Sequence, residues 1–197
     1  MPIKSQQVAA EIMQLFEKYG MEDYDGEPVS QSSHMVQCAM QAMKEGADKE
    51  LIVGSLLHDI GHLLRHEQPT EAMGSFGVVN HEGLGAEYLR SKGFSERICA
   101  IVEKHVDAKR YLVATQPAYR SKLSEASLQT LIWQGGPMNE SEVASFKLHP
   151  FRNDIIRVRL WDEMAKDANA KILPVDHFNT FIISCLNDSP TAHTALR

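Results

Sequence analysis

Apolar residues recur every three or four positions along most of the chain, a spacing that places them on one face of a helix. Four such stripes are clear: Val8, Ile12, Leu15 and Phe16; Val36, Ala39, Met40 and Met43; Leu51, Ile52, Leu56, Leu57 and Ile60; and Ile98, Ile101 and Val102. Further helices are predicted over residues 81–91, 122–133, 140–147, 151–168 and 176–186. Alternation with a period of two over the length of a strand is hard to find, so the pattern predicts an all-α fold.

The predicted helices are separated by breaks rich in glycine and proline, and one break is longer than the rest. Residues 65–80 lack helical periodicity and exceed the usual connection of about four to six residues, so we expect a functional loop there. The chain has 197 residues with neither an internal repeat nor a linker. At about 150 residues per domain, this length predicts a single domain over residues 1–197.

Charge and composition exclude several function classes. Lys and Arg number 20 against 26 Asp and Glu, a formal charge of -6, and no stretch is basic enough to bind nucleic acid. The longest apolar runs are far shorter than the roughly 20 residues of a membrane span. The three cysteines form no paired framework and the N-terminus resembles no secretion signal. We therefore expect a cytoplasmic protein with no nucleic-acid or membrane partner.

Histidine is the unusual residue, with nine in the chain, and several lie near carboxylates on predicted helices. The central stretch is Leu56-Leu57-His58-Asp59-Ile60-Gly61-His62. His58 and His62 are four positions apart and are therefore predicted to project from one face of a helix, with Asp59 turned about 100° away. Because a carboxylate has two oxygens, Asp59 could bridge two metal ions, whereas each imidazole binds one ion through one nitrogen.

The wider pattern is similar to a known family. The order His34, His58-Asp59, His81, His105 and Asp162 in a helical chain resembles the HD-domain superfamily of metal-dependent phosphohydrolases and oxygenases. Within it, the chain most resembles the mixed-valent diiron oxygenases that cleave carbon–phosphorus bonds. Matching stretches include residues 23–27, 74–81, 93–97, 105–112, 124–127, 134–138 and 159–163. A related phosphodiesterase branch typically has lysine at the position of His62, which favours the oxygenase interpretation.

The resemblance implies a single helical HD domain with a dimetal site in its core. One iron would be bound by His34, His58, Asp59 and Asp162, and the other by Asp59, His81 and His105, with Asp59 bridging. The cofactor would be two iron ions in a mixed Fe(II)/Fe(III) state. Imidazole and carboxylate ligands suit iron, and they leave zinc and manganese open as alternatives.

The resemblance also implies a set of substrate-binding residues and a catalytic loop. The phosphonate-binding positions of the family correspond to His62, Lys109, Ser127, Gln134 and Arg159. Charge supports this set, because a phosphonate dianion requires cationic donors. Spacing supports it as well: three of these residues lie three or four positions from His58, His105 and Asp162 respectively, which places each beside a ligand if the segments are helical.

Tyr24 and Glu27 correspond to a loop pair that guards the open iron position and responds to substrate. Phenolate oxygen can bind iron, and Glu27 could pair with a cationic amine on the substrate. We therefore count Tyr24, Glu27 and Asp59 as the catalytic residues.

The activity that the resemblance implies is an oxidative cleavage. A 1-hydroxy-2-ammonioethylphosphonate, with a primary or a trimethylated amine, would react with O2 to give phosphate and glycine or glycine betaine. The sequence leaves the degree of N-methylation open, and we expect a monomer or a small homo-oligomer. The alternative is a metal-dependent phosphohydrolase acting on a nucleotide or another phosphate ester. A non-catalytic ligand-sensing HD module is a third class, but it predicts lost ligands, and all six are present.

Overall fold

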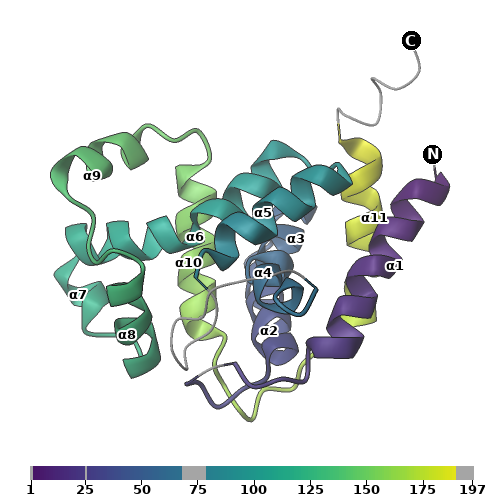
Figure 1. The fold of residues 1–197 in the computed structure, drawn as a ribbon, viewed down its shortest axis with the longest axis horizontal. Coiled ribbons are helices and arrows are strands. Elements are labelled where there is room, and N and C mark those ends of the chain that lie inside the picture. Colours follow the sequence, from purple (N-terminus) through teal and green to yellow (C-terminus); the bar gives the residue numbers. More distant parts are fainter. Residues whose placement is uncertain (1, 25, 68–78, 190–197) are drawn as a thin grey trace.

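The computed structural model describes residues 2–24, 26–67 and 79–189, whose regular structure is helical (Figure 1). Most of the expected 65–80 loop and Asp25 therefore lie outside the described residues. The elements are α1 (Pro2–Tyr19), α2 (Gln31–Lys44), α3 (Lys49–Leu57), α4 (Ile60–Leu64), α5 (His81–Lys92), α6 (Glu96–Thr115), α7 (Pro117–Arg120), α8 (Glu125–Trp133), α9 (Glu140–Lys147), α10 (Arg152–Met164), the 3-10 helix η1 (Val175–Phe178) and α11 (Asn179–Asp188). The described residues contain only an isolated bridge between Asp23 and Ser30 and no strand. The all-α prediction is confirmed.

The helices form a central bundle flanked on two sides. Helices α2 to α6 and α10 make up the centre, where α5 packs on α6, α2 on α3 and α10 on both α6 and α2. In Figure 1, α1 and α11 lie side by side at one edge, while α7, α8 and α9 lie at the opposite edge. The main apolar cluster contains the large buried side chains of Trp161, Phe178 and Met35. A second, smaller cluster consists of Leu112, Val113, Tyr119, Leu123 and Leu131. None of the helices in the described part of the chain is both long and apolar enough to cross a membrane.

The apolar stripe from Leu51 to Ile60, predicted as part of one helix, spans two helices in the structure. Helix α3 ends at Leu57 and α4 begins at Ile60, so His58 and Asp59 lie between two helices. In an unbroken helix the carbonyl of Ser55 would accept from the amide of residue 59, but it accepts a hydrogen bond from His58 Nδ1 at 2.8 Å. His58 and Asp59 are therefore placed by a turn rather than by a helix face.

Three other predicted boundaries differ from the structure. The helix predicted over 122–133 begins at Glu125, because Ser124 Oγ caps it by accepting from the Ser127 amide at 3.1 Å. A short helix with proline at its first position, α7, precedes it. The helix predicted over 151–168 ends at Met164, and the segment predicted over 176–186 begins as the 3-10 helix η1.

Candidate metal centre

The structure brings together all six residues that the sequence predicts as metal ligands. They come from five places in the bundle, namely α2, the α3–α4 junction, the start of α5, the middle of α6 and the end of α10. Each is at most 4% exposed. The six residues are His34, His58, Asp59, His81, His105 and Asp162.

The four imidazoles form two pairs whose Nε2 atoms face each other. His34 Nε2 lies 3.1 Å from His58 Nε2, and His81 Nε2 lies 3.2 Å from His105 Nε2. Metal–nitrogen bonds are about 2.0–2.1 Å long, so two nitrogens bound at right angles to one ion would be about 3 Å apart. Each pair therefore has the separation of two ligands that share one ion.

Backbone carbonyls fix the tautomer of three of these rings. The Nδ1 atom lies 2.9 Å from the carbonyl of Ala165 for His34, 2.8 Å from that of Ser55 for His58 and 2.8 Å from that of Val102 for His105. A carbonyl can only accept, so Nδ1 carries the hydrogen, and in the neutral ring Nε2 presents a lone pair. Two lone pairs facing each other repel unless a cation lies between them, and the arrangement fits a metal ion.

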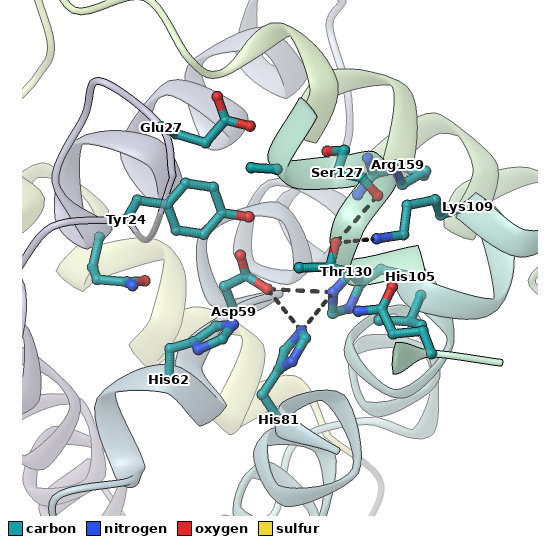
Figure 2. A pocket seen from close by; sticks show the side chains of 14 residues that line it. Tyr24, Glu27, Asp59, His62, His81, His105, Lys109, Ser127, Thr130 and Arg159 are labelled. Carbon is teal, nitrogen blue, oxygen red and sulfur yellow. Dashed lines mark hydrogen bonds and ion pairs between the residues drawn. The ribbon is translucent and has the colours of Figure 1, made fainter. Parts of the chain in front are cut away.

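Asp59 presents one carboxylate oxygen to each imidazole pair. Its Oδ2 lies 3.4 Å from His34 Nε2 and 3.3 Å from His58 Nε2. Its Oδ1 lies 3.3 Å from the Nε2 atoms of both His81 and His105. Figure 2 shows this second group converging. A carboxylate that offers one oxygen to each of two sites has the geometry of a bridging ligand.

Asp162 completes the first group. Its Oδ1 lies 3.4 Å from His34 Nε2 and, although buried, accepts no hydrogen bond from the described residues. An orphaned buried carboxylate oxygen is costly unless it binds a cation. Burial alone would raise the pKa of this carboxyl, but the Arg159 guanidinium and the imidazoles of His34 and His58 outweigh it and hold the pKa well below its ordinary value. The donor set therefore fits two metal ions.

Gly61 allows α4 to approach the start of α5. A Cβ atom at position 61 would lie 1.9 Å from the carbonyl oxygen of His81, far inside van der Waals contact. The two backbones therefore touch at the residue that carries the third imidazole, and this contact positions His81 against Asp59.

The ring of His62 packs against His81 and not against His58, which would be its neighbour on an unbroken helix. Its ring stacks on His81, with centroids 4.1 Å apart, while His58 pairs with His34. Burial, and next the neighbouring His81, keep the pKa of His62 well below its ordinary value. The ring is therefore neutral near pH 7 and offers a hydrogen bond rather than the charge that the sequence predicted.

A pocket opens beside the metal ligands and is lined by every residue that the sequence predicts for substrate binding. Figure 2 shows Lys109, Arg159 and Ser127 on one side of it, and His62 and Tyr24 on the other. The predicted residues among its lining are Tyr24, Glu27, His62, Lys109, Ser127, Gln134 and Arg159.

Lys109 is a buried lysine that lines this pocket. It lies one turn after His105 on α6, as the spacing predicts, and is 3% exposed. Its Nζ donates to Thr130 Oγ1 at 2.9 Å. Burial, and next the charge of Arg159, lower its pKa to about 7, because the ammonium has no carboxylate partner at hydrogen-bond distance among the described residues.

Arg159 spans the pocket and the first group of ligands. Its Nε donates to Tyr119 Oη at 2.8 Å, and its terminal nitrogens pair with Asp162 and Glu163. Arg159 and Asp162 share α10 and lie three residues apart, so the predicted proximity is present. A guanidinium held in this way is a fixed, planar donor for an anion.

Tyr24 covers the first ligand group. Its ring stacks on that of His34 at a centroid distance of 4.0 Å and an interplanar angle of 11°. Burial, then the carboxylates of Asp59 and Asp162, raise the pKa of this phenol well above its ordinary value. Glu27 follows in a tight turn in which its amide donates to the Tyr24 carbonyl at 2.8 Å, so both side chains belong to one small loop unit.

Sequence reasoning missed several residues of the site, and three of them hold predicted residues in place. Thr130 lies three residues after Ser127 on α8 and holds Lys109. Tyr119 on α7 orients Arg159. Lys166 lies four residues after Asp162 and pairs with Glu27 at 2.9 Å. The same three-or-four-residue spacing that identified Lys109 would have found Thr130 and Lys166, whereas Tyr119 carries no such signal.

Comparison with known proteins agrees with this geometry. Residues 32–172 match the HD domain family, a range that contains all six clustered ligands. The chain is 44% identical over 169 residues, covering 83% of each chain, to the [1-hydroxy-2-(trimethylamino)ethyl]phosphonate dioxygenase (glycine-betaine-forming) of Leisingera caerulea. It is also 34% identical over 178 residues to the hydroxymethylphosphonate dioxygenase of Gimesia maris, covering 90% of this chain and 88% of that protein.

An uncharacterized protein of Acanthamoeba polyphaga mimivirus is similar as well. It is 40% identical over 178 residues, covering 90% of this chain and 81% of the viral protein.

Proposed function

This chain belongs to the HD-domain family, and from that premise we propose that it is a diiron phosphonate dioxygenase. Its substrate would be a 1-hydroxy-2-ammonioethylphosphonate, with a primary or trimethylated amine. With one molecule of O2 the carbon–phosphorus bond would be cleaved to give phosphate and glycine or glycine betaine. Two of its relatives are named as phosphonate dioxygenases.

One observation carries the proposal most directly. The two carboxylate oxygens of Asp59 each face a pair of imidazole nitrogens at 3.3–3.4 Å. This arrangement favours two ions that share one bridge over a single ion. The proposed ligands are His34, His58, Asp59 and Asp162 for one iron and Asp59, His81 and His105 for the other. When bound, the Fe(II)/Fe(III) pair would supply Lewis acidity toward the substrate and redox chemistry toward O2.

The chain's own residues would bind and orient the phosphonate. Lys109 and Arg159 supply positive charge at the pocket wall, and a phosphonate would give the Lys109 ammonium the anionic partner that its surroundings lack. Ser127, Gln134 and His62 add neutral hydrogen bonds; the buried Oε1 of Gln134 and Nδ1 of His62 have no hydrogen-bond partner among the described residues. Unpartnered polar atoms in a cavity favour a polar ligand.

Tyr24 and Glu27 would respond to the other end of the substrate. The Tyr24 ring lies on His34 and would have to move for a substrate to reach the first metal site. Glu27 lines the pocket in the same turn. A cationic amine attracted to the Glu27 carboxylate would therefore act on the loop unit that also carries the covering phenol.

The test compares phosphate release with and without oxygen. Iron-loaded protein is mixed with the 1-hydroxy-2-aminoethyl and 1-hydroxy-2-(trimethylammonio)ethyl phosphonates in air and under argon. We expect release in air only, with one O2 consumed per phosphate in an oxygen electrode. 2-Aminoethylphosphonate, which lacks the 1-hydroxyl, serves as the matched control and should release none. Equal release under argon would contradict the oxygenase and indicate a metal-dependent phosphohydrolase.

A further inference from the structure

Lys166 lies behind the pocket wall and contacts two residues that line it. Its Nζ lies 2.9 Å from Glu27 Oε1 and donates to Ser127 Oγ at 2.9 Å. A second carboxylate, Glu163 Oε1, also lies 2.9 Å away. The Lys166 side chain is 12% exposed and that of Glu27 is 8% exposed. The ammonium is thus a largely buried cation held at the end of the pocket that carries Glu27.

The Glu27 oxygen that faces Lys166 is also bound by a hydroxyl. Ser124 Oγ donates to Glu27 Oε1 at 2.5 Å, so two donors of the protein converge on one carboxylate oxygen. The carboxylate that would attract a substrate amine is therefore already neutralised by a resident ammonium. An incoming cation must share Glu27 with Lys166 or displace it.

We propose that Lys166 is a positioning residue that sets selectivity at the cationic end of the substrate by competing for Glu27. The proposal rests on the function proposed above. A ligand without an amine does not meet this competition, whereas a cationic ligand must separate a partly buried ion pair. A primary ammonium can replace the hydrogen bond that Lys166 gives. A trimethylammonium has no N–H and gains only from charge, so it is disfavoured more.

The charged groups around Lys166 support the proposal that it disfavours cationic ligands. Lys166 is bracketed by Glu27 and Glu163, and burial, which would lower its pKa, is outweighed by Asp162 and Glu163. The lysine is therefore charged at neutral pH. Removing its charge leaves Glu27 without its cationic partner, whereas Glu163 keeps Arg159. The attraction of Glu27 for any cation that enters is thereby strengthened.

The test measures binding of three ligands that share one skeleton and lack the 1-hydroxyl. They are ethylphosphonate, 2-aminoethylphosphonate and 2-(trimethylammonio)ethylphosphonate, titrated by calorimetry into metal-loaded protein under argon. In Lys166→Met, we expect the affinity for each cationic ligand relative to ethylphosphonate to rise about tenfold. The rise should be larger for the trimethylated ligand. An unchanged or lower relative affinity would overturn the proposal.

Two further variants separate competition from a general structural effect. Lys166→Arg keeps the charge. Its affinity for each cationic ligand relative to ethylphosphonate should therefore stay within about twofold of the wild-type value. It also keeps the test informative if the methionine variant fails to fold. In Glu27→Gln, adding Lys166→Met should leave the ratio nearly unchanged, because the carboxylate that is competed for is gone. If Lys166→Met raised the relative affinity for cationic ligands equally in the wild-type protein and in Glu27→Gln, the proposal would be overturned.

The failure of this proposal can be told apart from the failure of the proposed function. Binding under argon requires no turnover, so the ratios report on Lys166 alone. If phosphate is never released in air but the ratios shift as expected, the oxygenase is wrong and the role of Lys166 stands. If phosphate is released and the ratios do not shift, only the role of Lys166 is wrong.

Discussion

Backbone carbonyls orient three imidazoles of the proposed metal centre. His34, His58 and His105 each have Nδ1 within 2.9 Å of a backbone carbonyl, so their Nε2 atoms point inward without further ordering. Asp59 is the residue on which the two ligand groups depend, because its two oxygens face different pairs. Burial alone would raise the pKa of Asp59, but His58 and the hydrogen-bonding imidazoles of His105 and His34 outweigh it, and the pKa lies well below the ordinary value.

Replacing the bridge should remove metal while keeping the shape of the side chain. In Asp59→Asn the amide nitrogen cannot act as an anionic ligand, so we expect the iron content after anaerobic loading to fall from two ions per chain to one or none. Elemental analysis of the desalted protein measures this. The matched control is Asp176→Asn, an exposed carboxylate on η1, which should keep both ions. Two ions bound by Asp59→Asn would contradict the bridging assignment.

The lowered pKa of Lys109 predicts a pH dependence of phosphonate binding. Burial and Arg159 bring this pKa to about 7, so the charged fraction in the free protein falls as the pH rises through 7. Below that value the ammonium is present and binding is favoured; above it, affinity should decline. Calorimetric titration of ethylphosphonate between pH 6 and about 9 measures the decline.

The control for this effect is Lys109→Arg, because a guanidinium stays charged throughout the range. The phosphonate itself gains charge as the pH rises, which strengthens binding in both proteins. Affinity should therefore fall with pH in the wild-type protein relative to Lys109→Arg. Parallel pH profiles would show that Lys109 does not titrate near 7 or does not bind the anion.

At the scale of elements, the predictions held where one helix carries both partners. Lys109 and His105 share α6, and Arg159 and Asp162 share α10, so spacing along the sequence translated into proximity. His62 also lies beside proposed ligands, namely Asp59 and His81. The break between α3 and α4 was not predicted, because periodicity does not register a side chain that takes a backbone carbonyl. Contacts between elements, such as that of Tyr119 with Arg159, have no signal in one sequence, because packing of distant segments creates them.

The contact between α4 and α5 predicts a strong effect of a small substitution. In Gly61→Ala the new Cβ would lie 1.9 Å from the His81 carbonyl oxygen, so the two helices must separate. We expect a loss of about 1–3 kcal/mol in the free energy of unfolding, together with weaker iron binding as His81 moves away from Asp59. Urea unfolding and an iron count measure the two effects.

Gly54→Ala is the matched control for this substitution. The atoms nearest to its Cβ would be side-chain atoms of Ile101, the closest at 3.1 Å, and a side chain can yield by a few tenths of an ångström. The control should keep its iron. If Gly61→Ala binds two ions and unfolds like the control, then the close approach of α4 and α5 does not position His81.

At the scale of the whole molecule, the metal centre joins segments that are distant in sequence. The proposed ligands run from His34 on α2 to Asp162 on α10, and the helices that carry them form the centre of the bundle in Figure 1. A group that binds the folded state and not the unfolded chain stabilises the fold by mass action. Without the proposed ions, buried carboxylates and facing nitrogen lone pairs remain, so bound ions would offset an unfavourable arrangement of charges.

Removing the metal should therefore lower the melting temperature. We expect chelator-treated, desalted protein to melt several degrees below the same protein reloaded with iron under argon, as followed by circular dichroism. The reloaded Asp59→Asn variant serves as the comparison and should recover less of the difference. Equal melting temperatures with and without iron would mean that the ions do not tie these segments together.

Two of the segments that line the pocket hold none of the proposed ligands. Helix α8 contributes Ser127 and Thr130, and the turn before α2 contributes Tyr24 and Glu27. Lys109 and Arg159, which would bind the phosphonate, share helices with proposed ligands, whereas Tyr24 and Glu27 do not. A chimaera that exchanges only these two segments with a relative should therefore alter selectivity at the amine end of the substrate, while the proposed metal ligands and the phosphonate-binding charges stay those of the recipient.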